Sequence, residues 1–432
     1  MSGIAEGSAP LEEIAALRQE RWRVQRAYVM ERSPFLSRLW AGQRVPERLE
    51  DLPALPFCDK GMLRESQAAH PPFGDYLAAA PERVVRLHRT SGTTGQAMNI
   101  AQTQADAAQT AEVGARSFRT AGLTPGTLAV HCLNYQMWMG GVSDHLALEA
   151  AGATVVPFGV GDSTLLVRTI LDLKVGAIHC TPSYPAALER TIAEHFPGLA
   201  PRDLGLRLAL FGGEAGLDEP SFRARLEAVW GFAPRNANYG ISDVFSNFAS
   251  QCAANNDLHF LGHDVLYAEL IEPESGDVVP WREGASGELV LTHLAREAQP
   301  LVRFRTNDVI AITGEGTCAC GREATRFRVL GRSDDMVVVR GINVFPAAVG
   351  GVVGGFDALS GEFRIRLKGR GPYDRLPVEA ELAEGAETSD ALVGHVEEAI
   401  KSKVRASASV TLLPAASMPR TDGKTQRLIR ED

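Results

Sequence analysis

Runs of basic residues and long apolar runs are both missing from this 432-residue sequence. No run of Lys or Arg exceeds a pair, and 44 basic against 53 acidic residues give a net charge of −9. Nucleic acids and anionic membranes are bound through concentrated positive charge, which this composition does not provide. The most apolar window, residues 336–356, contains Arg340, Asn343 and Pro346, so it cannot form a lipid-spanning helix. We therefore expect no nucleic-acid partner and no membrane partner.

Cysteine is also scarce, and the features of a signal peptide are not seen. A secreted chain usually begins with a basic segment followed by an apolar one, whereas residues 1–16 carry three glutamates and no such stretch. Six cysteines in a chain of this length are too few for a disulfide framework. These observations favour a cytoplasmic protein with reduced thiols. Only Cys318 and Cys320 lie close together in the sequence.

The short motifs of several common enzyme classes do not occur. The sequence has no Gly-x-x-x-x-Gly-Lys-Ser/Thr phosphate loop, no Gly-x-Gly-x-x-Gly dinucleotide fingerprint and no Gly-x-Ser-x-Gly nucleophile elbow. With 45% apolar and 22% charged residues the composition is that of an ordinary globular protein, and the length predicts two or more domains.

The pattern of strands and helices predicts an α/β fold. Apolar segments at 84–88, 127–132, 154–158, 176–180 and 206–211 are expected strands that alternate with expected helices at 105–120, 142–151, 162–173, 184–194 and 219–229. Such alternation is typical of layered parallel sheets. After Tyr239 the strands at 265–271, 288–293 and 308–312 predict a smaller β-rich subdomain within the same large N-terminal domain, residues 1–333.

The remaining residues, 334–432, predict a small, mobile α+β C-terminal domain. Short strands are expected at 336–340, 362–368, 378–382 and 409–413, with one strong helix at 390–404. At the opposite end of the chain, residues 11–39 have helical spacing and many charges, as in a helix docked on the surface of a domain.

A loop rich in glycine and hydroxyl groups follows the first expected strand. It contains Thr90, Ser91, Gly92, Thr93, Thr94 and Gly95 and ends at Gln96. Glycines allow close backbone approach, and the hydroxyl and backbone N–H groups can converge on an anion. A polyphosphate-binding loop and a solvated turn are both compatible with so short a motif.

Further motifs follow this loop in a definite order. They are Asn238-Tyr239-Gly240-Ile241-Ser242-Asp243, Arg303 to Asp308, Gly331 to Met336, Gly341 to Pro346, and Pro419 to Lys424. With these motifs the sequence resembles the adenylate-forming superfamily of acyl-CoA synthetases, adenylation domains and luciferases. Leu55-Pro56-Phe57 with Lys60, Thr181 to Tyr184, and Cys318 to Arg322 make it similar to the phenylacetate–CoA ligase family over essentially the whole chain.

The resemblance implies that ATP activates a carboxylic acid as an acyl-adenylate, which then passes to coenzyme A with release of AMP and pyrophosphate. It implies ATP, Mg²⁺ and coenzyme A as cofactors. The loop from Thr90 would hold the β- and γ-phosphates, Asp243 would bind Mg²⁺, and Asp308 would bind the ribose with Arg332 beside it. Lys424 would reach the carboxylate and the α-phosphate, where negative charge concentrates in the transition state.

The same resemblance assigns several further residues. Asp334 would be the hinge between two domain orientations, and Gly341 would lie beside the pantetheine arm of coenzyme A. Lys60 matches a position near the substrate or phosphate, although a surface lysine is equally compatible. The remaining nucleotide-binding candidates are Gly213, Glu214, Asn238, Tyr239, Gly240 and Ser242.

Aromatic and apolar residues are expected to line the acid pocket at the ends of the strands. The candidates are Tyr135, Met137 and Trp138 before Gly140-Gly141, then Tyr184, Gly213 and Phe245. Such a lining favours an aryl or arylacetic acid as the small-molecule partner. The Gly-Gly pair suggests a close backbone approach to this ligand. Ordinary core packing would explain any single one of these residues as well.

Four residues form a candidate metal site. Cys318-x-Cys320 is half of a zinc motif, and the resemblance implies that Cys252 and His259, spaced Cys-x6-His, supply the other half. Three thiolates and one imidazole leave no open position, so the Zn²⁺ would be structural. His263 is the competing fourth ligand.

Two residues depart from the family pattern. Gln96 stands where a lysine usually ends the phosphate loop, and Asp243 is one methylene shorter than the usual glutamate. Residues 347–355 carry four glycines where a helix is expected, at about 1 kcal/mol each relative to alanine. Besides an aryl or arylacetate–CoA ligase, an enzyme that loads a carrier protein or an amine and a non-catalytic ligand-binding relative remain open, as does a homodimer.

Overall fold

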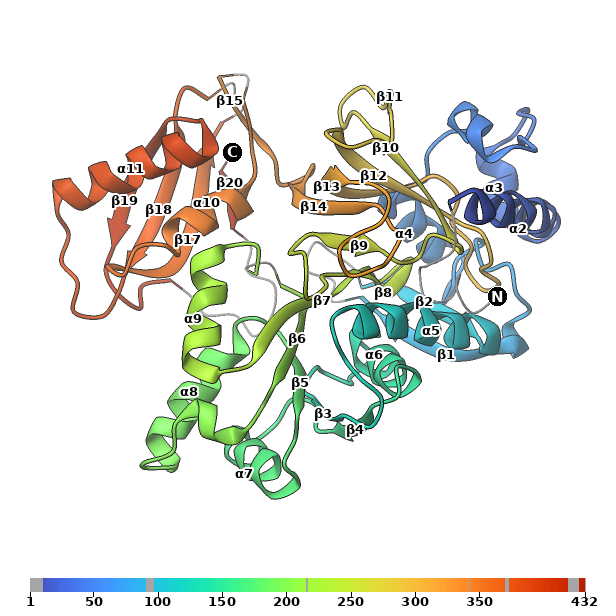
Figure 1. Cartoon of the computed structure of the whole chain (residues 1–432). Coiled ribbons are helices and arrows are strands. Elements are labelled where there is room, and N and C mark those ends of the chain that lie inside the picture. Colours follow the sequence, from blue (N-terminus) through green and yellow to red (C-terminus); the bar gives the residue numbers. More distant parts are fainter. Residues whose placement is uncertain are drawn as a thin grey trace. The chain divides into compact units, whose positions relative to one another are not determined.

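The computed structural model describes residues 11–90, 97–214, 217–340, 342–369, 373–418 and 427–431 (Figure 1). The chain divides into two compact units. The first consists of Met1–Leu217, Arg225–Thr306 and Ala311–Arg328, and the second of Asp218–Ala224, Asn307–Ile310 and Val329–Asp432. Within the described ranges, no helix combines the length and the apolar character needed to cross a bilayer.

The elements as far as β13 are, in chain order, α2 (Leu11–Arg32), α3 (Pro34–Leu39), α4 (Lys60–Ala69), β1 (Val84–Arg89), β2 (Asn99–Thr103), α5 (Gln104–Thr120), β3 (Leu128–His131), α6 (Met139–Ala150), β4 (Thr154–Pro157), α7 (Ser163–Leu173), β5 (Ala177–Cys180), α8 (Tyr184–His195), β6 (Leu208–Gly212), α9 (Pro220–Trp230), β7 (Ala233–Ile241), β8 (Phe245–Ser250), β9 (Leu258–Phe260), β10 (Leu266–Ile271), β11 (Val278–Val279), β12 (Ser286–His293) and β13 (Phe304–Gly314). The expected alternation of strands and helices is confirmed.

Five of these strands form the parallel part of the main sheet, in the order β4-β3-β5-β6-β7. All four residues of β5 are buried, as expected for a strand covered on both faces. Helices α5 and α6 lie on one side of these strands and α7 and α8 on the other (Figure 1). Polar caps begin the helices: Thr103 and Asp106 form a capping box on α5, and Asp162 accepts from the backbone N–H of Thr164 on α7.

The strand at Val84 differs from expectation, because it is neither buried nor parallel. β1 pairs antiparallel with β2 in a separate two-stranded sheet, and within β1 only His88 is buried. The sequence run Val-Val-Arg-Leu-His has the β-propensity of a strand, but propensity does not tell which partner the strand finds.

The β-rich part expected after Tyr239 is present, and its strands continue the main sheet. In the described residues the sheet has twelve strands, β11-β10-β12-β13-β14-β9-β8-β7-β6-β5-β3-β4. β7 joins the two parts because it pairs parallel with β6 and antiparallel with β8. A side chain at Gly240 of β7 would place its Cβ atom 1.9 Å from the Ser246 carbonyl oxygen of β8. Glycine alone therefore permits the close approach of these two strands at this position.

The later elements are β14 (Arg326–Arg332), β15 (Val337–Val339), β16 (Ile342–Val344), α10 (Pro346–Val353), β17 (Leu359–Lys368), β18 (Leu376–Leu382), α11 (Asp390–Val404), β19 (Ala408–Leu413) and β20 (Leu428–Glu431). Four of these strands form the sheet β19-β18-β17-β20, whose apolar side chains share a core with α10 and α11. The small α+β unit expected from the sequence is thus present. α10 forms despite its glycines, because Val349, Val352 and Val353 are buried in that core.

Candidate active site

The candidate residues of the first unit gather at the carboxyl ends of neighbouring parallel strands. Gly213 and Glu214 follow β6, and Asn238, Tyr239 and Gly240 form the end of β7. In open α/β sheets, ligands bind outside these carboxyl ends. The backbone is crowded at this edge: a Cβ atom on Gly212 would lie 2.5 Å from the Asn238 Cβ atom.

Lys60 and Asp243, assigned separately from the sequence, form an ion pair. Lys60 begins α4, which Asp59 caps through the backbone N–H of Met62, and its Nζ atom lies 2.8 Å from Asp243 Oδ2. The carboxylate is buried, whereas about a third of the lysine side chain is exposed. The other carboxylate oxygen, Oδ1, is buried and accepts no hydrogen bond from the described residues. This oxygen is a suitable ligand for a hard cation or for one of its water molecules.

Asp243 also borders a small pocket, whose other lining residues are Leu63, Tyr76, Ile100, Gln299 and Leu301. The pocket joins α4 to β2 and to the segment before β13, three regions far apart in sequence. Through its ion pair with Asp243, Lys60 contacts the motif that runs from Asn238 to Asp243, and it does not lie free on the surface.

Two arginines that were not assigned a role from the sequence hold the segment before Lys60. The guanidinium carbon of Arg303 lies 4.1 Å from the centre of the Phe57 ring, and that of Arg305 lies 5.7 Å away. The backbone of Cys58 donates to the Arg303 carbonyl and accepts from the Arg305 N–H. Arg303 is itself buried against Glu269. The signal was available, since Leu55-Pro56-Phe57 and Arg303-Phe304-Arg305 are both family motifs, but their contact spans about 250 residues of sequence.

In the second unit, Arg332 connects the proposed ribose ligand with the proposed hinge residue. Its Nη1 atom lies 3.1 Å from Asp308 Oδ1, and its Nε and Nη2 atoms donate to the two carboxylate oxygens of Asp334. Asn307, with φ 62°, donates through its side-chain amide to Asp334 as well. Asp308 and Arg332 were expected to lie close to the same sugar, and the structure brings these two side chains together. The contacts of both Arg332 and Asn307 with Asp334 were not expected from the sequence.

Three of the aromatic candidates for the acid pocket are only partly buried. Trp138 precedes α6, and its ring atom Cη2 would lie 3.5 Å from a Cβ atom on Gly213. The Tyr135 hydroxyl group is 2.9 Å from His145 Nδ1, and the Tyr184 hydroxyl group is 3.3 Å from Ser163 Oγ. Burial raises the pKa of Tyr184 to about 12, so its hydroxyl group stays protonated and can donate.

Phe245 differs from the other candidates, because its side chain is completely buried. It packs against His293 and under the guanidinium group of Arg296. Phe245 is thus a core residue in this structure and is not exposed to a substrate. The hydrophobicity that suggested a pocket residue reflects ordinary packing.

The Gly140-Gly141 pair also has an internal explanation. A Cβ atom on Gly141 would lie 2.4 Å from the Asn134 carbonyl oxygen, and one on Gly140 would lie 2.9 Å from the Trp138 ring. The glycines were expected to allow close approach to a ligand, but the neighbours they admit belong to the protein itself. Because these two positions carry no side chain, α6 can begin immediately after Trp138.

Several of the expected site residues lie outside the described part of the chain. They are Ser91, Gly92, Thr93, Thr94, Gly95 and Gln96 of the phosphate loop, together with Gly341 and Lys424. Thr90 is described, and its hydroxyl oxygen accepts a hydrogen bond from the Met98 backbone N–H while its own N–H donates to the Met98 carbonyl oxygen. Thr90 therefore closes the base of the loop.

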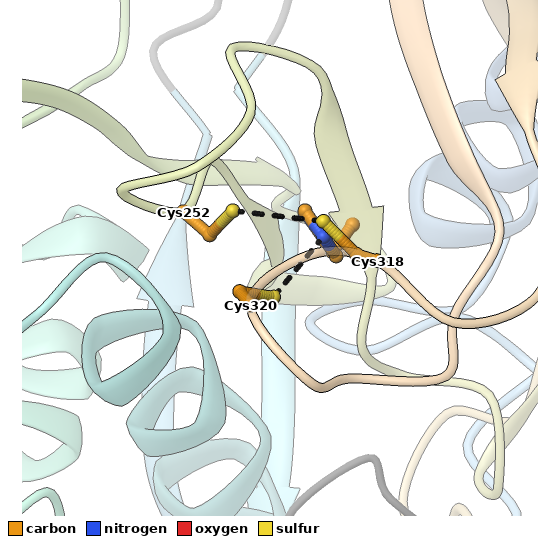
Figure 2. Close-up of side chains that lie close together, drawn as sticks. Cys252, Cys318 and Cys320 are labelled. Atoms are coloured by element: carbon orange, nitrogen blue, oxygen red, sulfur yellow. Dashed lines mark hydrogen bonds between the residues drawn. The ribbon is translucent and has the colours of Figure 1, made fainter.

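The four predicted zinc ligands form a cluster in the first unit. One ligand atom from each of Cys252, His259, Cys318 and Cys320 lies within 4.8 Å of the others. Figure 2 shows the sulfur atoms of the three cysteines turned toward one another. The Cys252 and Cys318 sulfurs are 4.0 Å apart, and Cys320 Sγ is 3.7 Å from His259 Nε2. Two thiolates of a tetrahedral site with Zn–S bonds of about 2.3 Å would be roughly 3.8 Å apart, so the donor set fits zinc.

The competing ligand, His263, is not part of this cluster. Its Nδ1 atom lies 3.3 Å from the Phe260 carbonyl oxygen. The tight turn at Cys318 to Arg322 is built by two backbone hydrogen bonds, from Cys318 N–H to the Arg322 carbonyl and from Gly321 N–H to the Cys318 carbonyl. This turn presents both cysteines toward His259 at the start of β9.

Comparisons with known proteins agree with this fold. Residues 341–431 match the family described as AMP-binding enzyme C-terminal domain. The chain is 35% identical to the phenylacetate-coenzyme A ligase of Thermus thermophilus, over 97% of this chain and 97% of the relative. It is 32% identical to that of Escherichia coli, over 98% and 95%. Its structure is similar to that of 2-hydroxyisobutyryl-CoA ligase in complex with 2-HIB-AMP in the postadenylation state, with a TM-score of 0.86, 28% identity, and coverage of 99% of this chain and 91% of that chain.

Fold, site and relatives together define an AMP-forming acid–CoA ligase. Such an enzyme uses ATP because a free carboxylate is a poor acyl donor, whereas an acyl-adenylate loses AMP readily to a thiol. Within this class, the chain belongs to the phenylacetate–coenzyme A ligase family. The family and the chemistry expected from the motifs are thereby confirmed.

Proposed function

We propose that this ligase activates an aryl or arylacetic acid. The observation that carries this proposal is the half-buried Trp138 ring beside Gly213, with the Tyr135 and Tyr184 rings at the ends of β3 and β5. Flat rings recognise flat ligands by stacking and edge contacts. The curated relatives are named for phenylacetate, whereas the structural relative is named for the aliphatic 2-hydroxyisobutyryl group. Of these two kinds of acid, the three rings favour the aromatic one.

We assign the nucleotide to the strand edge described above. The loop from Thr90 would bind the β- and γ-phosphates. Lys60, which pairs with Asp243, would offset part of the negative charge of these phosphates. Mg²⁺ fits the buried Oδ1 atom of Asp243, because this oxygen has no partner among the described residues. When bound, Mg²⁺ would neutralise phosphate charge. The resemblance to the family separately assigns Asp308 to the ribose hydroxyl groups, and within the second unit the Arg332 side chain holds Asp308 in place.

The direct experiment is a pyrophosphate-release assay across a panel of aromatic and aliphatic acids, with and without coenzyme A. An aromatic-acid ligase releases pyrophosphate with its preferred aromatic acid and forms thioester only when coenzyme A is added. A preference for aliphatic acids would contradict the proposed substrate class. Release without transfer to coenzyme A would instead favour a carrier protein or an amine as the acceptor.

Trp138→Ala is expected to lower kcat/KM for the best aromatic acid by roughly 5- to 150-fold. Loss of the indole removes apolar contact and stacking worth ~1–3 kcal/mol. The change should appear in the KM for the acid and hardly in the KM for ATP. Trp281→Ala, which removes another partly buried indole of the first unit, is the matched control. Unchanged discrimination between the aromatic acid and a medium-chain fatty acid would place Trp138 outside the pocket.

Asp243→Asn is expected to raise the Mg²⁺ concentration needed for half-maximal pyrophosphate release by about tenfold or more, because an amide is a weaker ligand for a hard cation than a carboxylate. The measurement is a Mg²⁺ titration at fixed ATP and acid. The control is Glu189→Gln, because Glu189 of α8 also carries a paired carboxylate, whose partner is Arg225. An unchanged Mg²⁺ requirement would leave Asp243 with a purely structural role as the partner of Lys60.

We further infer that Cys252, His259, Cys318 and Cys320 bind one structural Zn²⁺. The four donors leave no coordination position open for a substrate, so the metal would stabilise the turn at Cys318 and would take no part in the reaction.

A further inference from the structure

One buried carboxyl group is not explained by the assignments made so far. Asp144 lies on α6 and is completely buried. Its Oδ2 atom accepts a hydrogen bond from the side-chain amide of Asn238, whereas its Oδ1 atom is buried and accepts none from the described residues. The Ser246 hydroxyl group lies near the same carboxyl group but forms no hydrogen bond with it. A buried polar group left incompletely satisfied is costly and calls for an explanation.

Other buried carboxylates of the first unit differ from Asp144, because they pair with an arginine or, in the case of Asp243, with a lysine. Asp264 pairs with Arg116, Glu269 with Arg303 and Glu288 with Arg305. Asp144 forms no ion pair within the described ranges, and burial raises its pKa well above the usual value against the effects of Ser246 and Asn238. Burial therefore favours the uncharged form of this carboxyl group, which can donate as well as accept a hydrogen bond.

The position of Asp144 links it to the acid pocket. A Cβ atom on Gly140 would lie 3.2 Å from Asp144 Oδ2 and 2.9 Å from the Trp138 ring. The carboxyl group and the indole ring therefore both lie next to Gly140. Asn238, the partner of Asp144, packs against Gly212, which immediately precedes the Gly213 that the indole also approaches. Asn238 is only partly buried, so its amide can contact a ligand while Asp144 lies behind it.

We propose that the side chain of Asn238, held in place by Asp144, faces the acid and not the nucleotide to which its motif was assigned. Asn238 is then a specificity-determining residue at the polar end of the acid pocket, and the preferred acid carries a ring hydroxyl group. This inference rests on the proposed function. A hydroxyl group both donates and accepts, and the Asn238 side-chain amide, whose N–H is bonded to Asp144, can serve it as a partner. A site built to bond a hydroxyl group discriminates against the acid that lacks it, because its own polar groups are then left unpaired.

The test compares phenylacetate with its three ring-hydroxylated isomers. The wild-type protein should have a kcat/KM at least about tenfold higher for one of these isomers than for phenylacetate. In Asn238→Leu this ratio should fall to one or below, whatever the absolute rates. Asp144→Leu should lower the ratio similarly, and the double variant should lower it no further, because both changes remove one unit. Asp144→Asn should keep most of the preference, since its amide oxygen still accepts from Asn238.

Ser143→Ala is the matched control. Ser143 precedes Asp144 on α6, and its buried hydroxyl group contacts His88 of β1. This substitution should leave the substrate ratio unchanged. Equilibrium binding of the acids to the wild-type protein gives an independent readout if a variant does not fold. Equal kcat/KM and equal affinity for phenylacetate and all hydroxylated isomers would overturn the inference, as would an Asn238→Leu effect confined to the KM for ATP. Failure to use any aromatic acid would instead overturn the proposed function on which the inference rests.

Discussion

Lys424→Ala is expected to abolish acid-dependent pyrophosphate release while an added acyl-adenylate is still converted to thioester. The lysine matches the family residue that reaches the carboxylate and the α-phosphate, so we expect it to stabilise charge only in the first half-reaction. Removing a single group that stabilises transition-state charge typically costs about 10²- to 10³-fold in rate. The two halves are measured separately, by pyrophosphate release and by thioester formation from synthetic adenylate.

Lys401→Ala serves as the control, because it removes an exposed lysine from α11 in the same unit without touching the motif. It should leave both halves unchanged. An equal loss of both halves in Lys424→Ala would mean that the lysine is required for folding, or that its role is not restricted to adenylation.

Zinc is expected at about one ion per chain in the purified protein, and its removal should have a large effect on stability. Structural zinc contributes on the order of 10 kcal/mol of binding free energy in small zinc modules. We expect a strong chelator to lower the melting temperature, and Cys318→Ser to bind much less zinc because one of four ligands is lost. Metal analysis and thermal unfolding measure these two effects.

Cys180→Ser is the matched control, because Cys180 is a buried thiol of the same unit that lies on β5 outside the cluster. It should keep the full zinc content. Zinc content that is the same in Cys318→Ser as in the wild-type protein would refute the assignment of the four ligands.

Local features of the fold could be predicted because they depend on neighbours in the sequence. The spacing of apolar residues predicts α11 with its observed bounds, Asp390–Val404, and the alternation of strands and helices predicts the parallel part of the main sheet. β1 was identified as a strand, but its exposure and its antiparallel partner were not. β7 was missed, and with it the continuity of the sheet, because a strand that changes from parallel to antiparallel pairing has no distinct pattern in the sequence.

Residue types could be predicted for the site better than residue contacts. The motif Cys-x-Cys, with its upstream Cys and His, identified four residues that the structure brings together, yet only the fold decided between His259 and His263. Tyr135, Trp138 and Phe245 looked alike as apolar candidates. Burial separated them, because Phe245 is enclosed by His293 and Arg296.

The sequence by itself determined the family, the order of the motifs and the chemistry that they serve, because these are properties of residue identity and spacing. Tertiary structure alone decided which charged and polar groups meet. Lys60 and Asp243 are separated by 183 positions, and Asp144 and Asn238 by 94. The physical reason is that a buried charge or polar group is stable only when the fold supplies a partner, and partners come from segments whose approach depends on the packing of the whole sheet.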